Sequence, residues 1–251
     1  MLSAAATYKP MSIRLTIVAD GAPRYSVPAW SAKLAYAVGL IATDGNLASG
    51  GRLITFASVD RELVETFLSC LDRPNVYRTV TPRPSAIDGR VIGNRRELYF
   101  AQFHWAEFGR WLHSIGIAEA KSKTIERVEV PDEYFFHFVR GVLDGDGSIA
   151  NYFHRPVPHR RPNYVYERLS VAIYSGSYAF VDWLRAQLSQ RLGTRGSLYT
   201  NRHGVSSVSY GRGDSIRLLR QLYADSTAPC LNRKRVVWAN YRVRHYEILS
   251  A

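Results

Sequence analysis

The chain has 251 residues, of which 46% are hydrophobic, so it is long enough to bury one large core or two smaller ones. Its formal net charge of +12 predicts a polyanionic partner, with nucleic acid as the first candidate and an anionic membrane as the second. Two cysteines are too few for a disulfide framework, no apolar run approaches the roughly 18 residues of a membrane-spanning helix, and the N-terminus lacks a signal-peptide pattern.

The predicted elements of the first half follow an N-terminal arm over residues 1–29. Their order is helix 30–43, strand 52–59, helix 60–71, strands 76–81 and 95–103, and an amphipathic helix 104–115. We expect the joint between the halves at residues 126–131, so that the first half covers residues 30–127 and the second half residues 128–251.

The second half repeats this order. It has helix 132–145, strands 148–153 and 164–174, helix 177–192, strands 195–200 and 205–210, helix 214–223 and a basic helix 232–249. We interpret each half as α-β-β-α-β-β-α, which predicts an α+β fold that mixes helices and strands.

One stretch of sequence occurs twice. Residues 34–45 read LAYAVGLIATDG, and residues 136–147 read FHFVRGVLDGDG. An offset of 102 residues places Gly39 on Gly141 and Asp44 on Asp146. Each copy is an apolar helix that ends in an acid and a glycine, which indicates an internal repeat.

Small residues mark one face of each repeated helix. Residues spaced four apart are Ala35, Gly39 and Thr43 in the first copy and His137, Gly141 and Gly145 in the second. Glycine inside a helix costs about 1 kcal/mol against alanine, which indicates a packing reason. We therefore predict that the two helices pack closely through Ala35, Gly39, Gly141 and Gly145.

Such pairing places Asp44 and Asp146 side by side at one end of the helices. Gly45 and Gly147 are expected to stop the helices as C′ residues. Two carboxylates near two helix C-termini form a site of negative potential, which destabilises the fold unless a cation binds there. Hard divalent metals with oxygen ligands suit this site.

These residues resemble the LAGLIDADG family of homing endonucleases and maturases. Residues 37–45 read AVGLIATDG, and residues 139–147 read VRGVLDGDG. The first copy departs from the motif at Ala42 but keeps the last acid, Asp44, and the second copy keeps Asp146. Two copies in one chain resemble the monomeric members. The resemblance implies two pseudo-twofold related αββαββα halves, with paired motif helices at the interface and antiparallel sheets that form a saddle on DNA.

The resemblance also implies an activity. It predicts a site-specific homing endonuclease that hydrolyses phosphodiester bonds of double-stranded DNA and leaves short 3′ overhangs. The implied cofactor is Mg²⁺, with Mn²⁺ as a substitute and Ca²⁺ supporting binding without cleavage. The implied metal ligands are Asp44, Asp146 and the backbone carbonyls of Thr43 and Gly145.

The implied biology is intron homing by a monomer that binds a long pseudo-palindromic duplex, with no membrane involved. A bacterial source implies a cytoplasmic, nucleoid-associated protein, and an organelle is the alternative location. The alternative functions are an RNA maturase that acts on intron RNA and a non-catalytic DNA-binding regulator. Retention of both motif acids favours the nuclease, because binding alone does not require them.

Lysine is scarce, and three lysines follow the last amphipathic helix of a half, namely Lys121, Lys123 and Lys234. In the family, a basic residue near this place activates water or neutralises phosphate. The resemblance therefore implies catalytic roles for Lys121 and Lys234 beside Asp44 and Asp146. Lys123 is the alternative in the first half, and a simple phosphate contact or surface charge is the alternative role.

Strand 164–174 alternates polar and apolar side chains, which predicts a sheet with one face on the core and one in water. Arg, Tyr and Ser on the wet face are able to contact phosphates and base edges, although an ordinary solvated face is the alternative. The predicted DNA-binding residues are Tyr166, Arg168, Ser170, Tyr174, Arg195, Ser197, Tyr199, Asn201, Ser207 and Ser209, with Arg78 and Arg96 in the first half.

Overall fold

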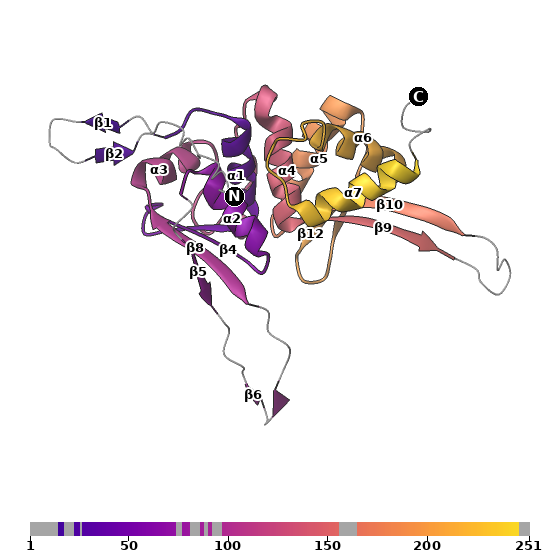
Figure 1. Ribbon diagram of the computed structural model, residues 1–251, viewed down its shortest axis with the longest axis horizontal. Helices are drawn as coiled ribbons and strands as arrows, with labels where there is room; N and C mark the ends of the chain where they lie inside the picture. The colour runs from indigo at the N-terminus through magenta and orange to yellow at the C-terminus, as the bar shows by residue number, and fades with distance from the viewer. Residues whose placement is uncertain are drawn as a thin grey trace, which may run out of the picture.

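The structure is a computed structural model of the chain (Figure 1). It describes residues 27–73, 97–155 and 165–245, together with the backbone of five short strands. These strands are β1 (Leu15–Ile17), β2 (Pro23–Tyr25), β5 (Tyr77–Val80), β6 (Ala86–Ile87) and β7 (Arg90–Val91).

The first half contains one four-stranded antiparallel sheet with strand order β3-β4-β8-β5. Its other elements are α1 (Ala32–Thr43), β3 (Gly45–Ala48), β4 (Leu53–Ser58), α2 (Arg61–Cys70), β8 (Leu98–His104), α3 (Ala106–Ser114) and the 3₁₀ helix η1 (Lys121–Lys123). The short pairs β1–β2 and β6–β7 are separate hairpins. The predicted N-terminal arm thus carries the first of these hairpins.

The second half contains the second four-stranded antiparallel sheet, with strand order β11-β12-β10-β9. Its elements are the 3₁₀ helix η2 (Asp132–Tyr134), α4 (Phe135–Asp146), β9 (Gly147–His154), β10 (Tyr166–Ser175), α5 (Tyr178–Leu192), β11 (Ser197–Thr200), β12 (Ser206–Tyr210), α6 (Arg212–Leu222) and α7 (Asn232–Arg244). Both halves therefore follow the predicted order αββαββα, and α7 is an addition to the second.

Helices α1 and α4 pack against each other at the centre of the molecule (Figure 1). A Cβ atom on Gly39 would lie 2.2 Å from the carbonyl oxygen of Phe138, and one on Gly141 would lie 2.2 Å from that of Tyr36. No side chain fits at either position, because each glycine lies against backbone of the other helix. The predicted close pairing is confirmed, and Ala35 is fully buried on the same helix.

The helices end at Gly45 and Gly147 as predicted, but without the left-handed conformation that is typical of a C′ glycine. Neither glycine is a left-handed C′ residue: Gly45 begins β3, and Gly147 begins β9 with an extended φ of −123°. Each helix is followed directly by a strand. A Cβ atom on Gly45 would lie 2.6 Å from the Cα of Ile41, and one on Gly147 would lie 2.6 Å from the carbonyl oxygen of Leu143. Glycine is needed there for space rather than for a positive φ.

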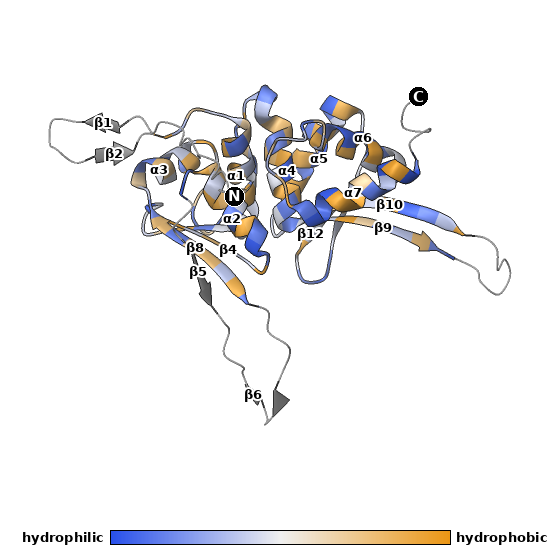
Figure 2. Ribbon diagram, viewed as in Figure 1, coloured by the Kyte–Doolittle hydropathy of each residue, from blue (hydrophilic) through white to orange (hydrophobic). Residues whose placement is uncertain are grey.

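Both sheets lie on the same side of the α1–α4 pair and diverge from it (Figure 1). Helices α2 and α3 pack on the first sheet, and α5, α6 and α7 pack on the second, which leaves the opposite sheet faces open. Figure 2 shows hydrophilic residues along the outer part of β10 and at the start of α7. Within the described ranges, no helix is long and apolar enough to cross a membrane.

Candidate catalytic centre and nucleic-acid interface

The motif acids lie at the same end of the paired helices. Asp44 caps α1, Asp146 is the last residue of α4, and both reach the surface. A Cβ atom on Gly145 would lie 2.0 Å from Thr43 Oγ1 and 3.0 Å from Asp44 Oδ2. The absence of a side chain at position 145 therefore makes room for Thr43 and for the Asp44 carboxylate.

The pKa values of both carboxylates are raised. Burial, followed by the nearby Asp146 carboxylate, raises the pKa of Asp44 from 3.8 to about 6, against the opposing effect of Lys234 and Lys121. Burial also raises the pKa of Asp146, and the same two lysines oppose this shift. The geometry thus holds two acids in a place where their charged forms are unfavourable without a cation.

Each acid has a buried lysine at its own helix end. Lys234 Nζ donates to the carbonyl oxygens of Leu143 at 2.5 Å, Asp144 at 2.9 Å and Gly147 at 2.7 Å. These contacts place a positive charge at the C-terminus of α4, where the helix dipole favours it. Burial lowers the pKa of Lys234 to about 8, although the nearby Asp144 and Asp44 carboxylates favour its charged form.

Lys121 makes the matching contacts in the first half. Its Nζ donates to the carbonyl oxygen of Gly45 and, at 3.4 Å, to that of Thr43. Lys121 is buried while Lys123 is exposed, so the structure brings Lys121 and not Lys123 to the acids. Burial lowers its pKa to about 8, against the effect of Asp44 and Asp146.

The oxygen atoms at this end of the helices fit a hard divalent cation. The predicted ligands are the carboxylates of Asp44 and Asp146, whose pKa values are raised, and the carbonyls of the adjacent Thr43 and Gly145; all are oxygen donors, the type that Mg²⁺ prefers. In the part of the chain that the structure describes, no group of three His, Cys, Asp or Glu side chains could hold a metal.

Asp144, two residues before the second motif acid, is buried and connects neighbouring helices. It is 1% exposed, and its Oδ2 accepts hydrogen bonds from Tyr36 OH at 2.9 Å and from the backbone N of Leu231 at 2.7 Å. These bonds join α1, α4 and the start of α7. Sequence reasoning did not single out Tyr36, because no local pattern indicates a partner 108 residues away.

We predict that Asp44→Asn stabilises the protein in the absence of metal, and that the gain depends on pH. The folded-state pKa of about 6 lies above the ordinary 3.8, so ionisation of Asp44 costs stability once the pH rises through this window. The gain should be small near pH 4 and full above pH 6, at about 1 kcal/mol after solvent screening, or roughly 2–4 °C in Tm. Thermal melting across this range measures it, and a gain independent of pH would contradict the electrostatic explanation.

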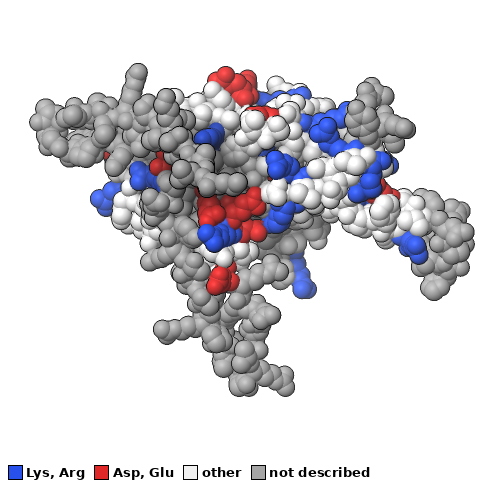
Figure 3. Space-filling model, viewed as in Figure 1, with Lys and Arg blue, Asp and Glu red and all other residues white. Residues whose placement is uncertain are grey.

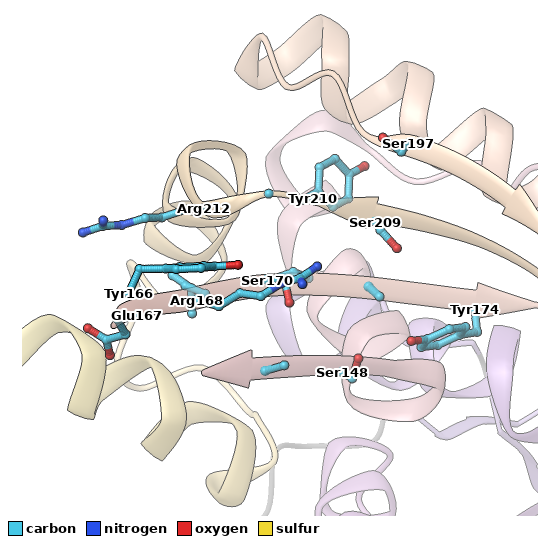
Figure 4. Close-up of a pocket in the computed structure, with 15 residues that line it drawn as sticks. Ser148, Tyr166, Glu167, Arg168, Ser170, Tyr174, Ser197, Ser209, Tyr210 and Arg212 are labelled. Atoms are coloured by element: carbon cyan, nitrogen blue, oxygen red, sulfur yellow. The ribbon is translucent and has the colours of Figure 1, made fainter. Parts of the chain in front are cut away.

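The open face of β10 has the predicted alternation. Leu169, Val171 and Ile173 are buried in the core, whereas the predicted DNA-binding residues Tyr166, Arg168, Ser170 and Tyr174 face the other way. Together with neighbouring strands they line a groove of about 650 Å³ (Figure 4).

The hairpin β11–β12 continues this face. Ser197 pairs with Ser209, and Tyr199, which is 67% exposed, pairs with Ser207. Ser207 is nearly buried, and its hydroxyl donates to the carbonyl oxygen of Tyr199 at 3.4 Å. Ser207 is therefore the least accessible of the predicted contacts whose side chains the structure describes.

Two further predicted residues lie at the ends of β11. Arg195 is exposed just before the strand. Asn201 follows it, and its side-chain oxygen accepts hydrogen bonds from the backbone N of His203 and of Val205. That oxygen holds the hairpin turn, which leaves the Asn201 amide nitrogen as the group for an outside contact.

The structure adds residues that the sequence reasoning missed. Because β9 pairs with β10, its residues Ser148, Ala150, Tyr152 and His154 share the groove face. In the first half, Thr55 and Gln102 occupy the corresponding open face, and Gln102 Nε2 lies 3.4 Å from Thr55 Oγ1. Assigning faces to strand 95–103 by alternation would have found Gln102.

The structure places only one of the two DNA-binding residues predicted in the first half. The backbone of Arg78 pairs with Phe100, which places it in register with the open face of β8. Arg96 lies outside the described residues.

Positive charge is not confined to the open sheet faces. Figure 3 shows Lys and Arg side chains over α6 and α7 and an acidic group near the centre of the same view. The exposed arginines of α7 are Arg233, Arg235, Arg242 and Arg244.

A scan against protein-family models finds no match, and a search of curated proteins finds no relative. Solved structures do share the fold. I-SmaMI bound to uncleaved DNA with calcium ions matches with a TM-score of 0.55 at 10% identity, over 88% of this chain and 94% of that chain. The homing endonuclease I-WcaI bound to its DNA recognition sequence matches with a TM-score of 0.50 at 14% identity, over 77% and 82%.

Variants of the homing endonuclease I-DmoI match with a TM-score of 0.50 at 14% identity, over 83% of this chain and 97% of theirs. The chain therefore has the fold of these endonucleases, and the resemblance to LAGLIDADG proteins is confirmed at the level of the fold.

Proposed function

We propose that the protein is a site-specific endonuclease that hydrolyses both strands of a DNA duplex and leaves short 3′ overhangs. The observation that carries the proposal is the duplicated centre. Asp44 with Lys121 at the end of α1 and Asp146 with Lys234 at the end of α4 form two equivalent sets of groups. Two sets at one helix interface suit a substrate with two strands.

Asp44 and Asp146, with the carbonyls of Thr43 and Gly145, would hold the metal. Bound Mg²⁺ supplies charge neutralisation at the phosphate and an acidified water. Burial raises the pKa of both acids, and the nearby Asp146 carboxylate raises that of Asp44 further, so their pairing favours a cation over an empty site. We propose that Mn²⁺ substitutes and that Ca²⁺ supports binding without cleavage.

The lysines contribute charge rather than a base. Three backbone carbonyls surround Lys234 Nζ, and this arrangement matches the three protons of an ammonium group and supports the charged form. Lys234 and, through its own carbonyl contacts, Lys121 hold positive charge beside the carboxylates, where it attracts the phosphate and compensates the two helix C-termini.

The open sheet faces would bind the duplex. A two-stranded ribbon fits the major groove, and Arg168, Tyr166 and Gln102 are side chains able to contact phosphates and base edges. The divergence of the two sheets from the α1–α4 pair gives one surface for each half of a long site, which one chain contacts as a monomer. Intron homing is the biological role that we propose for this activity.

We predict that duplex binding weakens steeply with salt. The formal charge of +12 supplies cations that displace condensed counterions from DNA. Contacts with about six phosphates would give a slope of about −5 in log K against log salt. A fluorescence-anisotropy titration on a bound duplex measures the slope, and a value near zero would contradict binding through a cationic surface.

The experiment that tests the activity starts from a randomised double-stranded library. The wild-type protein first selects duplexes in Ca²⁺, and the selected sequences are then incubated in Mg²⁺ or Mn²⁺. We expect one preferred site, cleavage of both strands there and short 3′ overhangs on end mapping. A protein that selects duplexes but never cuts them in either metal would instead be a non-catalytic binder, and a protein that selects intron RNA over duplex would be a maturase.

A further inference from the structure

The outer part of the groove is built by only two strands. In the described pairing, β12 pairs with β10 from Val171 to Ser175, whereas β9 pairs with β10 from Tyr166 to Ile173. The segment of β10 from residue 166 to residue 170 is therefore half of a two-stranded ribbon. An isolated two-stranded ribbon is marginally stable in water, so this one needs support from elsewhere.

Tyr166 and Arg168 lie in this ribbon and line the groove, whereas the carboxylate of Glu167 between them contacts the end of α7. Figure 4 shows Arg168 lying over the groove while Glu167 turns toward α7. The Glu167 side chain is only 8% exposed, although it lies near the end of a projecting ribbon. A carboxylate this buried requires partners.

Its partners come from β9 and from the end of α7. Glu167 Oε1 accepts hydrogen bonds from Asn151 Nδ2 at 2.8 Å and from Arg244 Nη2 at 2.7 Å, and Oε2 lies 2.5 Å from His245 Nε2. Arg244 Nη2 also donates to Asn151 Oδ1 at 2.5 Å. The end of α7 is thus joined to both strands of the ribbon.

The same network reaches the backbone of a groove residue. Asn151 Nδ2 donates to the carbonyl oxygen of Arg168 at 3.1 Å. Burial alone would raise the pKa of Glu167, but hydrogen bonds from His245, Asn151 and Arg244 hold it at about 2. The carboxylate is therefore charged near neutral pH, the form that pairs with Arg244.

We propose that Glu167, Asn151 and Arg244 form a clamp through which the end of α7 fixes the β9–β10 ribbon and sets the base contacts of Tyr166 and Arg168. The inference rests on the proposed DNA binding and identifies which positioning residues determine its specificity. None of the three clamp residues contacts the duplex, because they lie on the helix side of the sheet. They act by positioning the side chains of Tyr166 and Arg168 in the groove.

The test uses the duplex that the wild-type protein selects from a randomised library, together with all its single-base-pair substitutions. An Arg168→Ala variant first marks the base pairs that the ribbon reads, as the positions where discrimination is lost. Arg244→Gln then removes the clamp without changing β10. Its matched control is Arg242→Gln, because Arg242 is exposed on the same helix and carries the same charge.

We expect Arg244→Gln to lose about tenfold discrimination at the base pairs that Arg168→Ala marks, within the range that one good base contact provides. Discrimination at other base pairs should be unchanged, and Arg242→Gln should keep the wild-type pattern throughout. Glu167→Gln should reproduce the Arg244→Gln pattern from the other side of the contact.

Two results would overturn the clamp while leaving the proposed function intact. One is that Arg244→Gln discriminates at the marked base pairs as well as the wild-type protein does. The other is a uniform loss of affinity that Arg242→Gln shares, since this would reflect net charge alone. If the wild-type protein selects no duplex at all, the proposed function is wrong, and the clamp is wrong with it.

Discussion

Gly141→Leu is expected to disrupt the native pairing of α1 and α4. A Cβ atom at this position would lie 2.2 Å from the carbonyl oxygen of Tyr36 and 3.0 Å from the Cα of Gly39. Both contacts are with backbone, so relief requires the helices to separate rather than a side chain to rotate. Overpacking at a site this closed should cost at least ~3 kcal/mol, a fall in Tm of roughly 6–12 °C or complete loss of folding.

Gly213→Leu is the matched control for this substitution. Gly213 is also helical, in α6, but a Cβ atom there would meet nothing within 4 Å. Removing glycine from an open helical site should leave Tm unchanged or raise it slightly. Thermal melting of the two variants side by side measures the difference. Equal Tm values would mean that the α1–α4 contact does not require glycine at position 141.

The repeated helices could be predicted because their signal is local and doubled. Gly39 and Gly141 are unusual inside apolar helices, and their spacing to Asp44 and Asp146 is the same in both copies. The alternation on β10 is equally local, and the structure confirms it. Short-range periodicity thus determines which faces meet and which acids come together.

Other features depend on contacts between distant residues, which no local pattern encodes. The predicted order αββαββα requires a strand after Asp44, but β3 itself was not located, because a four-residue strand is too short for alternation to be recognised. The contacts at the start of α7 could not be predicted for the same reason. Arg233 Nη2 contacts Asp60 Oδ2 at 2.7 Å, and the backbone N of Asn232 donates to Glu62 Oε1 at 3.0 Å, across 173 and 170 residues.

The lysines could be predicted in part from local sequence, and in part only from the fold. Their position after the last helix of each half made Lys121 and Lys234 candidates, with Lys123 as the alternative in the first half. Only the fold separates Lys121 from Lys123, because η1 turns one side chain inward to the end of α1 and leaves the other exposed. The clamp around Glu167 was not predicted either. The alternation of strand 164–174 assigns Glu167 to the core-facing side but does not indicate its partners.

Asp44→Asn and Asp146→Asn are each expected to abolish double-strand cleavage while duplex binding is retained. The amide keeps the shape of the carboxylate but removes the charge that holds a divalent cation against phosphate. A loss of several kcal/mol of transition-state stabilisation corresponds to roughly a 10³-fold lower rate. Binding should be unchanged or tighter, because a negative group near DNA has been removed.

The two acids come from different helices, so the product of each single variant is informative. A variant that keeps one complete set of groups should nick a single strand, unless the two sets share a metal. Asp182→Asn is the control, because Asp182 lies on α5 and pairs there with Arg185 at 2.8 Å. This control should cut both strands at the wild-type rate.

Cleavage of a supercoiled plasmid that carries the selected site, in Mg²⁺ and beside a gel-shift assay in Ca²⁺, tests the central claim most directly. We predict that the wild-type protein and Asp182→Asn linearise the plasmid, whereas Asp44→Asn and Asp146→Asn bind it equally well and yield nicked or uncut DNA. If either motif-acid variant linearises the plasmid at the wild-type rate, the paired acids are not the catalytic metal ligands and the proposed centre is wrong.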